Sequence, residues 1–188
     1  MSKSSKGATW EREFSKKLSS WWTCGERDDV FWRSTTSGAR ATTRAKQGLA
    51  TSGQYGDIAT QDPIGQPMLD TFTIELKRGY SKDSIQSLFD ARDGAAVQPY
   101  AAFLDQTITS ATQAGTPHWM LVVKRDRRVP LVMTDYPFFL RWKKWSRGYT
   151  RIIPEALFRL PNAVTVHCTR LDDWLACVAP DDIRRMLG

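Results

Sequence analysis

Two short stretches of the chain read GDIA at residues 56–59 and TIELK at residues 73–77. Both contain apolar and β-branched residues, and turn-forming Asp, Pro and Gly residues separate them, which is typical of neighbouring β-strands. Side chains two positions apart on a strand lie on the same face. Glu75 and Lys77 are therefore predicted to lie side by side, while Ile74 and Leu76 face an apolar layer on the other side.

Asp57 adds a second carboxylate if the strand at 56–59 pairs with the strand at 73–77. Two carboxylates and a lysine on one sheet face suit a hard divalent cation such as Mg²⁺, which prefers oxygen ligands and keeps several waters. Such a site favours hydrolysis of phosphodiesters. A Glu-x-Lys pair alone is also common on the solvated face of an antiparallel sheet. The apolar flanks of Glu75 and the upstream Asp57 are what favour the metal site.

The composition favours a folded, basic protein of one domain. The chain has 188 residues, of which 41% are hydrophobic, so it can form a core and is unlike a disordered chain. There are 27 Lys and Arg residues against 20 Asp and Glu, and the net charge of +7 favours a polyanionic partner, nucleic acid before membrane. We expect a flexible tail at 1–6, a core at 7–135 and a C-terminal extension at 136–188 of a single domain.

The cysteines and the N-terminus predict a cytoplasmic location. Cys24, Cys168 and Cys177 have no C-x-x-C spacing, which favours a reduced intracellular setting without a zinc site. The N-terminal residues lack the apolar region of a secretory signal. No apolar run approaches the roughly 20 residues that span a bilayer, so we expect no membrane partner.

The first helix is predicted over residues 8–22, because Trp10, Phe14, Leu18 and Trp21 recur at helical spacing. Glu11 lies at the border of this apolar stripe, where a carboxylate can face a cleft. The alternative is that Glu11 and Glu13 are solvated and stabilise the helix dipole near its N-terminus.

A strand is predicted at 30–34, followed by a loop at 35–55 that is rich in Thr, Ser, Gly and Ala. Loops of this length are usually functional or disordered. Its cations Arg40, Arg44 and Lys46 suit contact with a phosphate backbone. A surface loop with incidental charge is the alternative.

The remaining pattern predicts further helices and a hairpin. We expect part-helical structure at 79–93, a helix at 98–114, a hairpin of 118–124 with 129–134, a strand at 163–168, and short helices at 171–175 and 180–187. Gln106 and Gln113 on the helix at 98–114 could reach the site, although glutamines on a solvated helix face are commoner. Residues 136–151 interleave aromatics with cations, which suits either base stacking or, given the helical spacing of the aromatics, a core stripe. The hairpin tip at 124–128 is strongly basic.

The order of these elements resembles the PD-(D/E)XK nuclease superfamily. The stretch KGATWERE at 6–13 is similar to the Lys-Gly-x-x-x-Glu-Arg-Glu opening of archaeal-type Holliday junction resolvases. The stretch at 30–37, with its Arg-Ser pair and downstream small residues, is similar to their next strand. The resemblance covers about residues 6 to 80 and departs from the pattern at Gly56, which stands where the motif name has Pro. The loop at 35–55 and the C-terminal extension are also longer than in compact resolvases.

The resemblance implies an α/β fold with a central mixed sheet flanked by helices, a restriction-endonuclease-like core and a C-terminal helical extension. Carried over by position, Glu11, Asp57 and Glu75 are the acidic metal-site residues, the backbone carbonyl of Leu76 is a further ligand, and Lys77 is the site lysine. Contacts to DNA are expected from Arg33, Ser34, Ser37, Arg40, Arg44 and Lys46.

The expected activity is that of a DNA endonuclease dependent on Mg²⁺, with Mn²⁺ as a substitute, encoded by a prokaryote or phage. By resemblance we expect a homodimer that cleaves branched DNA such as Holliday junctions. The alternatives are a site-specific or phage- or restriction-type endonuclease acting on duplex DNA, a non-catalytic DNA-binding protein on the same fold, and a basic RNA-binding protein.

Overall fold

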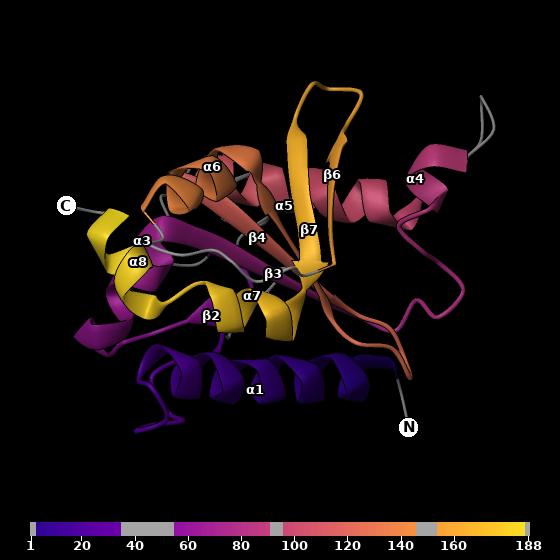
Figure 1. Ribbon diagram of the computed structural model, residues 1–188. Coiled ribbons are helices and arrows are strands. Elements are labelled where there is room, and N and C mark those ends of the chain that lie inside the picture. Colours follow the sequence, from indigo (N-terminus) through magenta and orange to yellow (C-terminus); the bar gives the residue numbers. More distant parts are fainter. Residues whose placement is uncertain (1–2, 35–54, 91–95, 146–153, 187–188) are drawn as a thin grey trace.

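The computed structural model describes all residues except 1–2, 35–54, 91–95, 146–153 and 187–188. A mixed sheet of five strands forms its centre, with the order β3-β4-β5-β7-β6. Its strands are β3 (Phe72–Arg78), β4 (His118–Lys124), β5 (Leu131–Asp135), β6 (Glu155–Arg159) and β7 (Thr165–Arg170). β3 and β4 are parallel, and the other neighbours are antiparallel. The predicted α/β fold with a mixed sheet flanked by helices is confirmed (Figure 1).

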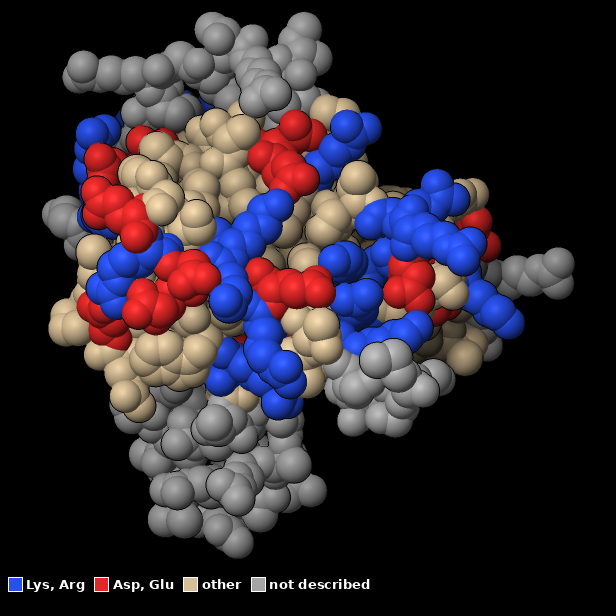
Figure 2. Space-filling model, turned by 90° about the horizontal axis from the view of Figure 1, so that it is seen from below, with Lys and Arg blue, Asp and Glu red and all other residues tan. Residues whose placement is uncertain are grey.

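Helices cover both faces of this sheet (Figure 1). They are α1 (Lys3–Trp22), α3 (Gln66–Thr71), α4 (Ser87–Asp90), α5 (Pro99–Ala114), α6 (Tyr136–Trp145), α7 (Leu171–Cys177) and α8 (Pro180–Met186), with a short 3₁₀ turn η1 (Pro63–Gly65). One core cluster packs α1, α6, α7 and α8 on one face, and a second packs α5 on the other. The face seen from below carries many Lys and Arg side chains, with Asp and Glu among them (Figure 2).

The alternation of side chains on the sheet fixes which face receives the predicted site. Ile74 and Leu76 of β3 belong to the α1 core, as the sequence predicts. The intervening Glu75 and Lys77 lie on the α5 face, opposite Leu121 and Val123 in the parallel register with β4. Two charged residues on β3 thus occupy a face that is apolar on the adjacent strand.

The two stretches of the predicted site are joined differently from the prediction. β2 (Ile58–Ala59) pairs antiparallel with β1 (Trp32–Arg33) in a separate two-stranded ribbon. It forms no ladder with β3 in the part of the chain that the structure describes, but the amide of Asp57, just before β2, donates to the Ile74 carbonyl at 2.8 Å. The pairing that was the condition for bringing Asp57 to Glu75 does not form, but this bond still brings residue 57 to the edge of β3.

Several predicted boundaries also change. α1 begins at Lys3, so residues 3–6 of the expected flexible tail are helical. In the described part of 79–93 the helix is confined to Ser87–Asp90. The helix at 66–71 and the strand at 155–159 were missed. No helix among the described residues is long and apolar enough to cross a membrane.

The C-terminal extension is an integral part of the core. It supplies β6 and β7 of the central sheet as well as α7 and α8, so it is more than a helical extension. Phe138 and Trp142 are buried, which favours the core-stripe interpretation of α6 over base stacking. Because α8 and α1 share one core cluster, we propose that the described residues form one domain.

Candidate active site

Glu75 and Lys77 form the centre of the site on β3. The Glu75 side chain is only 6% exposed, and its Oε2 atom lies 3.4 Å from Nζ of Lys77. The two-residue spacing places both on one face of the strand, as predicted. A buried carboxylate beside a lysine that is still partly exposed is suited to bind a polar ligand at the strand surface.

Helix α5 supplies two further contacts to this pair. Gln106 accepts a hydrogen bond from Lys77 Nζ at 2.9 Å and donates one to Glu75 Oε2 at 3.4 Å. Ser110 donates to the other oxygen, Glu75 Oε1, at 3.1 Å. Positions four apart lie on one face of a helix, so both side chains reach the same carboxylate. Of the two glutamines considered, Gln106 contacts the site, whereas no contact of Gln113 with the site is observed among the described residues.

Sequence reasoning missed Ser110. Its signal was the i, i+4 spacing from Gln106 on the predicted helix. That spacing becomes informative only when one member of the pair is known to face the site. Which face of α5 meets β3 depends on the packing of Leu104 and other core residues of the helix, which the local sequence does not specify.

Asp57 is held against the edge of β3 by two hydrogen bonds. Its amide donates to the Ile74 carbonyl, and its Oδ2 atom accepts from the Leu76 amide, both at 2.8 Å. In an extended strand the N–H and C=O of one residue point to the same edge. The Leu76 carbonyl therefore points to the edge that Asp57 occupies, so that Asp57, Glu75 and Leu76 offer three oxygen-bearing groups at the middle of β3.

Gly56 permits this close approach. Its φ is +84°, and a Cβ atom added there would lie 2.7 Å from the Ile74 carbonyl oxygen. Any larger residue would both clash with the β3 backbone and adopt a strained conformation. The glycine that stands at the Pro position of the motif name thus has a structural reason of its own.

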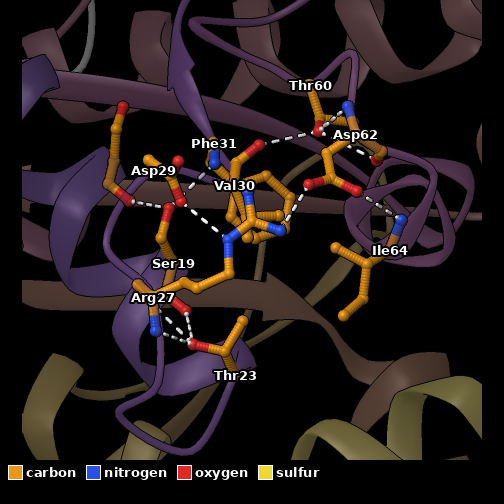
Figure 3. A network of polar contacts seen from close by, with 10 residues as sticks. Ser19, Thr23, Arg27, Asp29, Val30, Phe31, Thr60, Asp62 and Ile64 are labelled. Carbon is orange, nitrogen blue, oxygen red and sulfur yellow. Dashed lines mark hydrogen bonds and ion pairs between the residues drawn. The ribbon is translucent and has the colours of Figure 1, made fainter.

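A network of polar contacts fixes the ribbon that carries Asp57 (Figure 3). Arg27 follows α1 and bridges Asp29 at 2.8 Å and Asp62 at 2.7 Å. Thr60 donates to the Val30 carbonyl at 2.7 Å, which ties the two sides of the ribbon together. The ribbon strands are only two residues long. Side-chain contacts therefore hold these strands in position, where longer strands are held by backbone hydrogen bonds.

The same network reaches back into α1 (Figure 3). Ser19 accepts a hydrogen bond from the Phe31 amide at 2.8 Å, and Thr23 donates to the Arg27 carbonyl at 3.0 Å. The first bond connects the C-terminal half of α1 to the start of the ribbon, and the second closes the turn that follows α1. The position of Asp57 therefore depends on residues far from it in the sequence.

The surroundings of Asp57 disfavour its ionised form, which a nearby positive charge would stabilise. Burial, and then the nearby negative charge of Glu75, raise the pKa of Asp57 to about 7, although the Leu76 amide and Lys77 act in the opposite direction. Two acidic groups buried together are stabilised in their ionised forms by a cation. The described residues contain no group of three or more His, Cys, Asp or Glu side chains able to hold a metal ion. Two carboxylates and a carbonyl suit an ion such as Mg²⁺ that keeps several waters.

Glu11 and Arg33 lie next to this centre and are paired with one another. Glu11 Oε2 forms an ion pair with Arg33 Nε, and its negative charge contributes to the raised pKa of Asp57. The structure thus places Asp57, Glu75 and Lys77 together on β3 and at its edge, with Glu11 near enough to act on Asp57, while their roles in a metal site stay a prediction. The ion pair itself was not predicted.

The remaining predicted contact residues divide into two groups. Ser34 is buried, and its amide donates to the Asp57 carbonyl at 2.8 Å, so its backbone helps to hold the ribbon. Ser37, Arg40, Arg44 and Lys46 lie outside the described residues. Glu13, the other acidic residue considered on α1, contacts Arg78 and Lys124 and not the site.

Comparison with known families gives one result. A family model described as "Phage putative PDDEXK endonuclease" matches residues 2–184. The chain belongs to this family. No curated protein and no solved structure matches the chain. Membership of this phage PDDEXK family confirms the predicted superfamily, while the closeness to Holliday junction resolvases stays a prediction.

Proposed function

We propose that the protein is a divalent-metal-dependent DNA endonuclease. The observation that carries this proposal is the buried pair of Asp57 and Glu75 at the edge of β3, with Lys77 in contact with Glu75. The phage PDDEXK endonuclease family to which the chain belongs supports hydrolysis of nucleic acid, and the net charge of +7 suits a polyanionic substrate.

We assign the metal to Asp57, Glu75 and the Leu76 carbonyl, with Mg²⁺ as the natural ion and Mn²⁺ as a substitute. When bound, the ion supplies a positive charge that stabilises the negative charge developing on the attacked phosphate. Asp57 and Glu75 hold this charge at the strand edge, because Gly56 and Ser110 fix their positions. Because burial raises the pKa of Asp57 to about 7, part of the Asp57 population is protonated at neutral pH, and a bound metal ion would favour the ionised form.

Lys77 is assigned to the water and the phosphate. Its Nζ atom, held by Gln106 at 2.9 Å, can orient the attacking water and donate a hydrogen bond to the pentacoordinate phosphate. Glu11 is assigned to a second ion or to a water, which requires it to exchange the contact with Arg33. Arg33 is then released to contact the DNA backbone, together with Ser37, Arg40, Arg44 and Lys46, whereas the buried Ser34 is assigned to holding the ribbon.

Two isosteric substitutions test this assignment. Asp57→Asn and Glu75→Gln are expected to lower Mg²⁺-dependent cleavage by at least about 10²-fold, the effect of removing a group that stabilises transition-state charge. DNA binding in EDTA should change little. The control is Asp105→Asn on the exposed side of α5, which removes the same charge away from the site. Equal cleavage by wild type and both site variants would refute the assignment.

For the substrate, we propose structure-selective cleavage of branched DNA by a homodimer, as in the resolvases that residues 6–13 resemble. Two sites related by a two-fold axis suit paired cuts on opposing strands. Cleavage of duplex DNA is the alternative, which the phage family favours equally. A panel of four-way junctions, flaps and linear duplexes, with Mg²⁺ and mapped product ends, distinguishes the two. Sedimentation at micromolar concentration tests the dimer.

A further inference from the structure

The strongest feature outside the active site is a basic surface at the ends of β3 and β4. We define this tip surface by Lys6, Arg78, Lys124, Arg125, Arg127 and Arg128. It joins the end of β3 to the turn between β4 and β5, beside the N-terminal half of α1 (Figure 1). We propose that the tip surface binds the phosphate backbone of a duplex arm that flanks the cleaved phosphate. This inference rests on the proposed DNA endonuclease activity.

Alternating ion pairs hold the tip surface in place. Lys6 lies 3.5 Å from Asp126, Lys124 lies 3.2 Å from Glu13, and Glu13 lies 3.7 Å from Arg78. Two acidic side chains therefore hold three cations, which links the turn to α1 and leaves a net positive charge. These three held cations lose little side-chain entropy when they bind a rigid polyanion.

Arg78 is incompletely satisfied by these contacts. Its Nε atom is buried and has no hydrogen-bond partner, and the nearest acidic oxygen, from Asp126, is 4.0 Å away. Its Nη1 atom is 3.7 Å from Glu13, beyond hydrogen-bond distance. A guanidinium with one unpartnered buried donor and only long ion pairs can turn toward a further anionic acceptor, and a phosphate oxygen supplies one.

Arg127 and Arg128 at the turn are exposed, and no contact of either side chain is observed among the described residues. Arg127 has a φ of +59°, which is unfavourable for a residue other than glycine. The turn nevertheless closes through the Arg128 amide, which donates to the Arg125 carbonyl at 3.2 Å. Two arginines therefore stay in solvent on a defined turn, where they are free to contact phosphates.

The distance from the active site suits one duplex arm. Arg78 follows Glu75 by three residues on β3, about 10 Å along a strand, and it lies beside Lys124 in the register with β4. The turn continues outward from there. At 3.4 Å per base pair, a surface that begins about 10 Å from Glu75 along the strand meets phosphates from about three base pairs beyond the cut outward.

The test compares two double variants of equal charge. Arg127→Ala with Arg128→Ala removes two cations from the tip surface and keeps a Cβ at both positions, so the backbone conformation is equally strained. Lys144→Ala with Arg159→Ala is the control. Both control residues are exposed, and they lie on α6 and on β6 at the other edge of the sheet from β3.

Binding of each protein to a labelled duplex and to a four-way junction is measured in EDTA between 50 and 200 mM salt. The tip variant is expected to reduce the slope of log affinity against log salt by about 1.8, or 0.9 for each phosphate contact. The ratio of wild-type affinity to tip-variant affinity should therefore be about tenfold larger at 50 mM than at 200 mM salt. The control should keep the wild-type slope, and equal melting temperatures should show that both variants are folded.

Equal slopes for all three proteins overturn the inference, and so does an equal loss in both variants, which would indicate bulk charge. Cleavage with Mg²⁺ is measured in parallel on the same DNAs. If wild type cleaves but the tip variant binds like the control, the inference fails and the proposed function stands. If wild type cleaves none of the DNAs, the proposed function fails, whatever the slopes show.

Discussion

The two halves of the candidate site are built in different ways. Glu75 and Lys77 belong to β3, which pairs with β4 over seven residues. Asp57 precedes a ribbon of two-residue strands. A long ladder defines side-chain direction by itself, because alternation along a strand is fixed. A ribbon this short requires other contacts to hold its position, and Arg27 and Thr60 supply them.

The difference shows where the site is robust and where it is sensitive. Altering one side chain of β3 leaves the ladder intact, so the expected losses there are chemical. Altering a residue of the ribbon moves Asp57 relative to Glu75, and a displacement of about 1 Å can cost about 10²-fold in rate. Substitutions remote from the chemistry in sequence are therefore expected to rank among the most damaging.

The largest effect is expected from Gly56→Ala. The new Cβ would lie 2.7 Å from the Ile74 carbonyl oxygen at a φ of +84°, so the ribbon must move away from β3. We expect a loss of about 3 kcal/mol or more in the free energy of unfolding, and at least about 10²-fold in cleavage. Chemical denaturation and cleavage assays measure the two losses.

Gly115→Ala is the matched control for this prediction. Gly115 ends α5 with a φ of +72°, but an added Cβ meets nothing within 4 Å. It should lose only about 1–2 kcal/mol from the left-handed backbone, with cleavage almost unchanged in the protein that remains folded. If both glycine variants lose the same stability and activity, the close approach at Gly56 has no special role.

The contrast also explains what the sequence could predict. The strand at 73–77 and the pairing of Glu75 with Lys77 follow from alternation over a few residues, and the structure confirms them. β6 was missed because only Phe158 of its five residues is buried, so it has no alternating pattern. α3 was missed because its Pro67 and the preceding Gly65 were interpreted as turn residues.

The placement of Asp57 could be predicted only in part. Its proximity to Glu75 was expected from a strand pairing that does not form, and the single bond to Ile74 replaces it. The Glu11–Arg33 ion pair joins residues 22 positions apart, and no local pattern specifies such a contact. The same holds for Ser110, whose role depends on the docking of α5 against β3.

An intermediate effect is expected from Gln106→Leu on α5, which alters the half of the site that belongs to β3. This change removes the hydrogen bonds to both Lys77 and Glu75 while keeping a side chain of similar size. Loss of a residue that orients a metal ligand typically costs 10- to 100-fold in metal affinity or activity. We therefore expect the Mg²⁺ concentration for half-maximal cleavage to rise about tenfold, with little change in melting temperature.

Gln113→Leu is the control on the same helix, because Gln113 is exposed. A Mg²⁺ titration of cleavage separates positioning from structure, since a merely structural defect would lower the melting temperature and leave the metal requirement unchanged. An unchanged Mg²⁺ dependence in Gln106→Leu would show that α5 does not position the metal-site carboxylate.

The smallest effect is expected from Arg27→Met. This variant tests, through the pH dependence of the melting temperature, whether the Arg27 ion pairs stabilise the ribbon. The hydrogen bond from Arg27 lowers the pKa of Asp29 below its ordinary value of 3.8. A carboxyl with a lowered pKa stabilises the fold above that ordinary value, and the contribution disappears as the pH falls through the folded-state pKa. The melting temperature of the variant should thus lie below that of wild type at pH 7, and the difference should disappear in strong acid.

Lys16→Met is the control, because it removes a single exposed ion pair with Asp28. It should change the melting temperature less than Arg27→Met does, because Arg27 also contacts Asp62 across the ribbon. A gap between Arg27→Met and wild type that persists at pH 2 would assign the role of Arg27 to packing rather than to its charge.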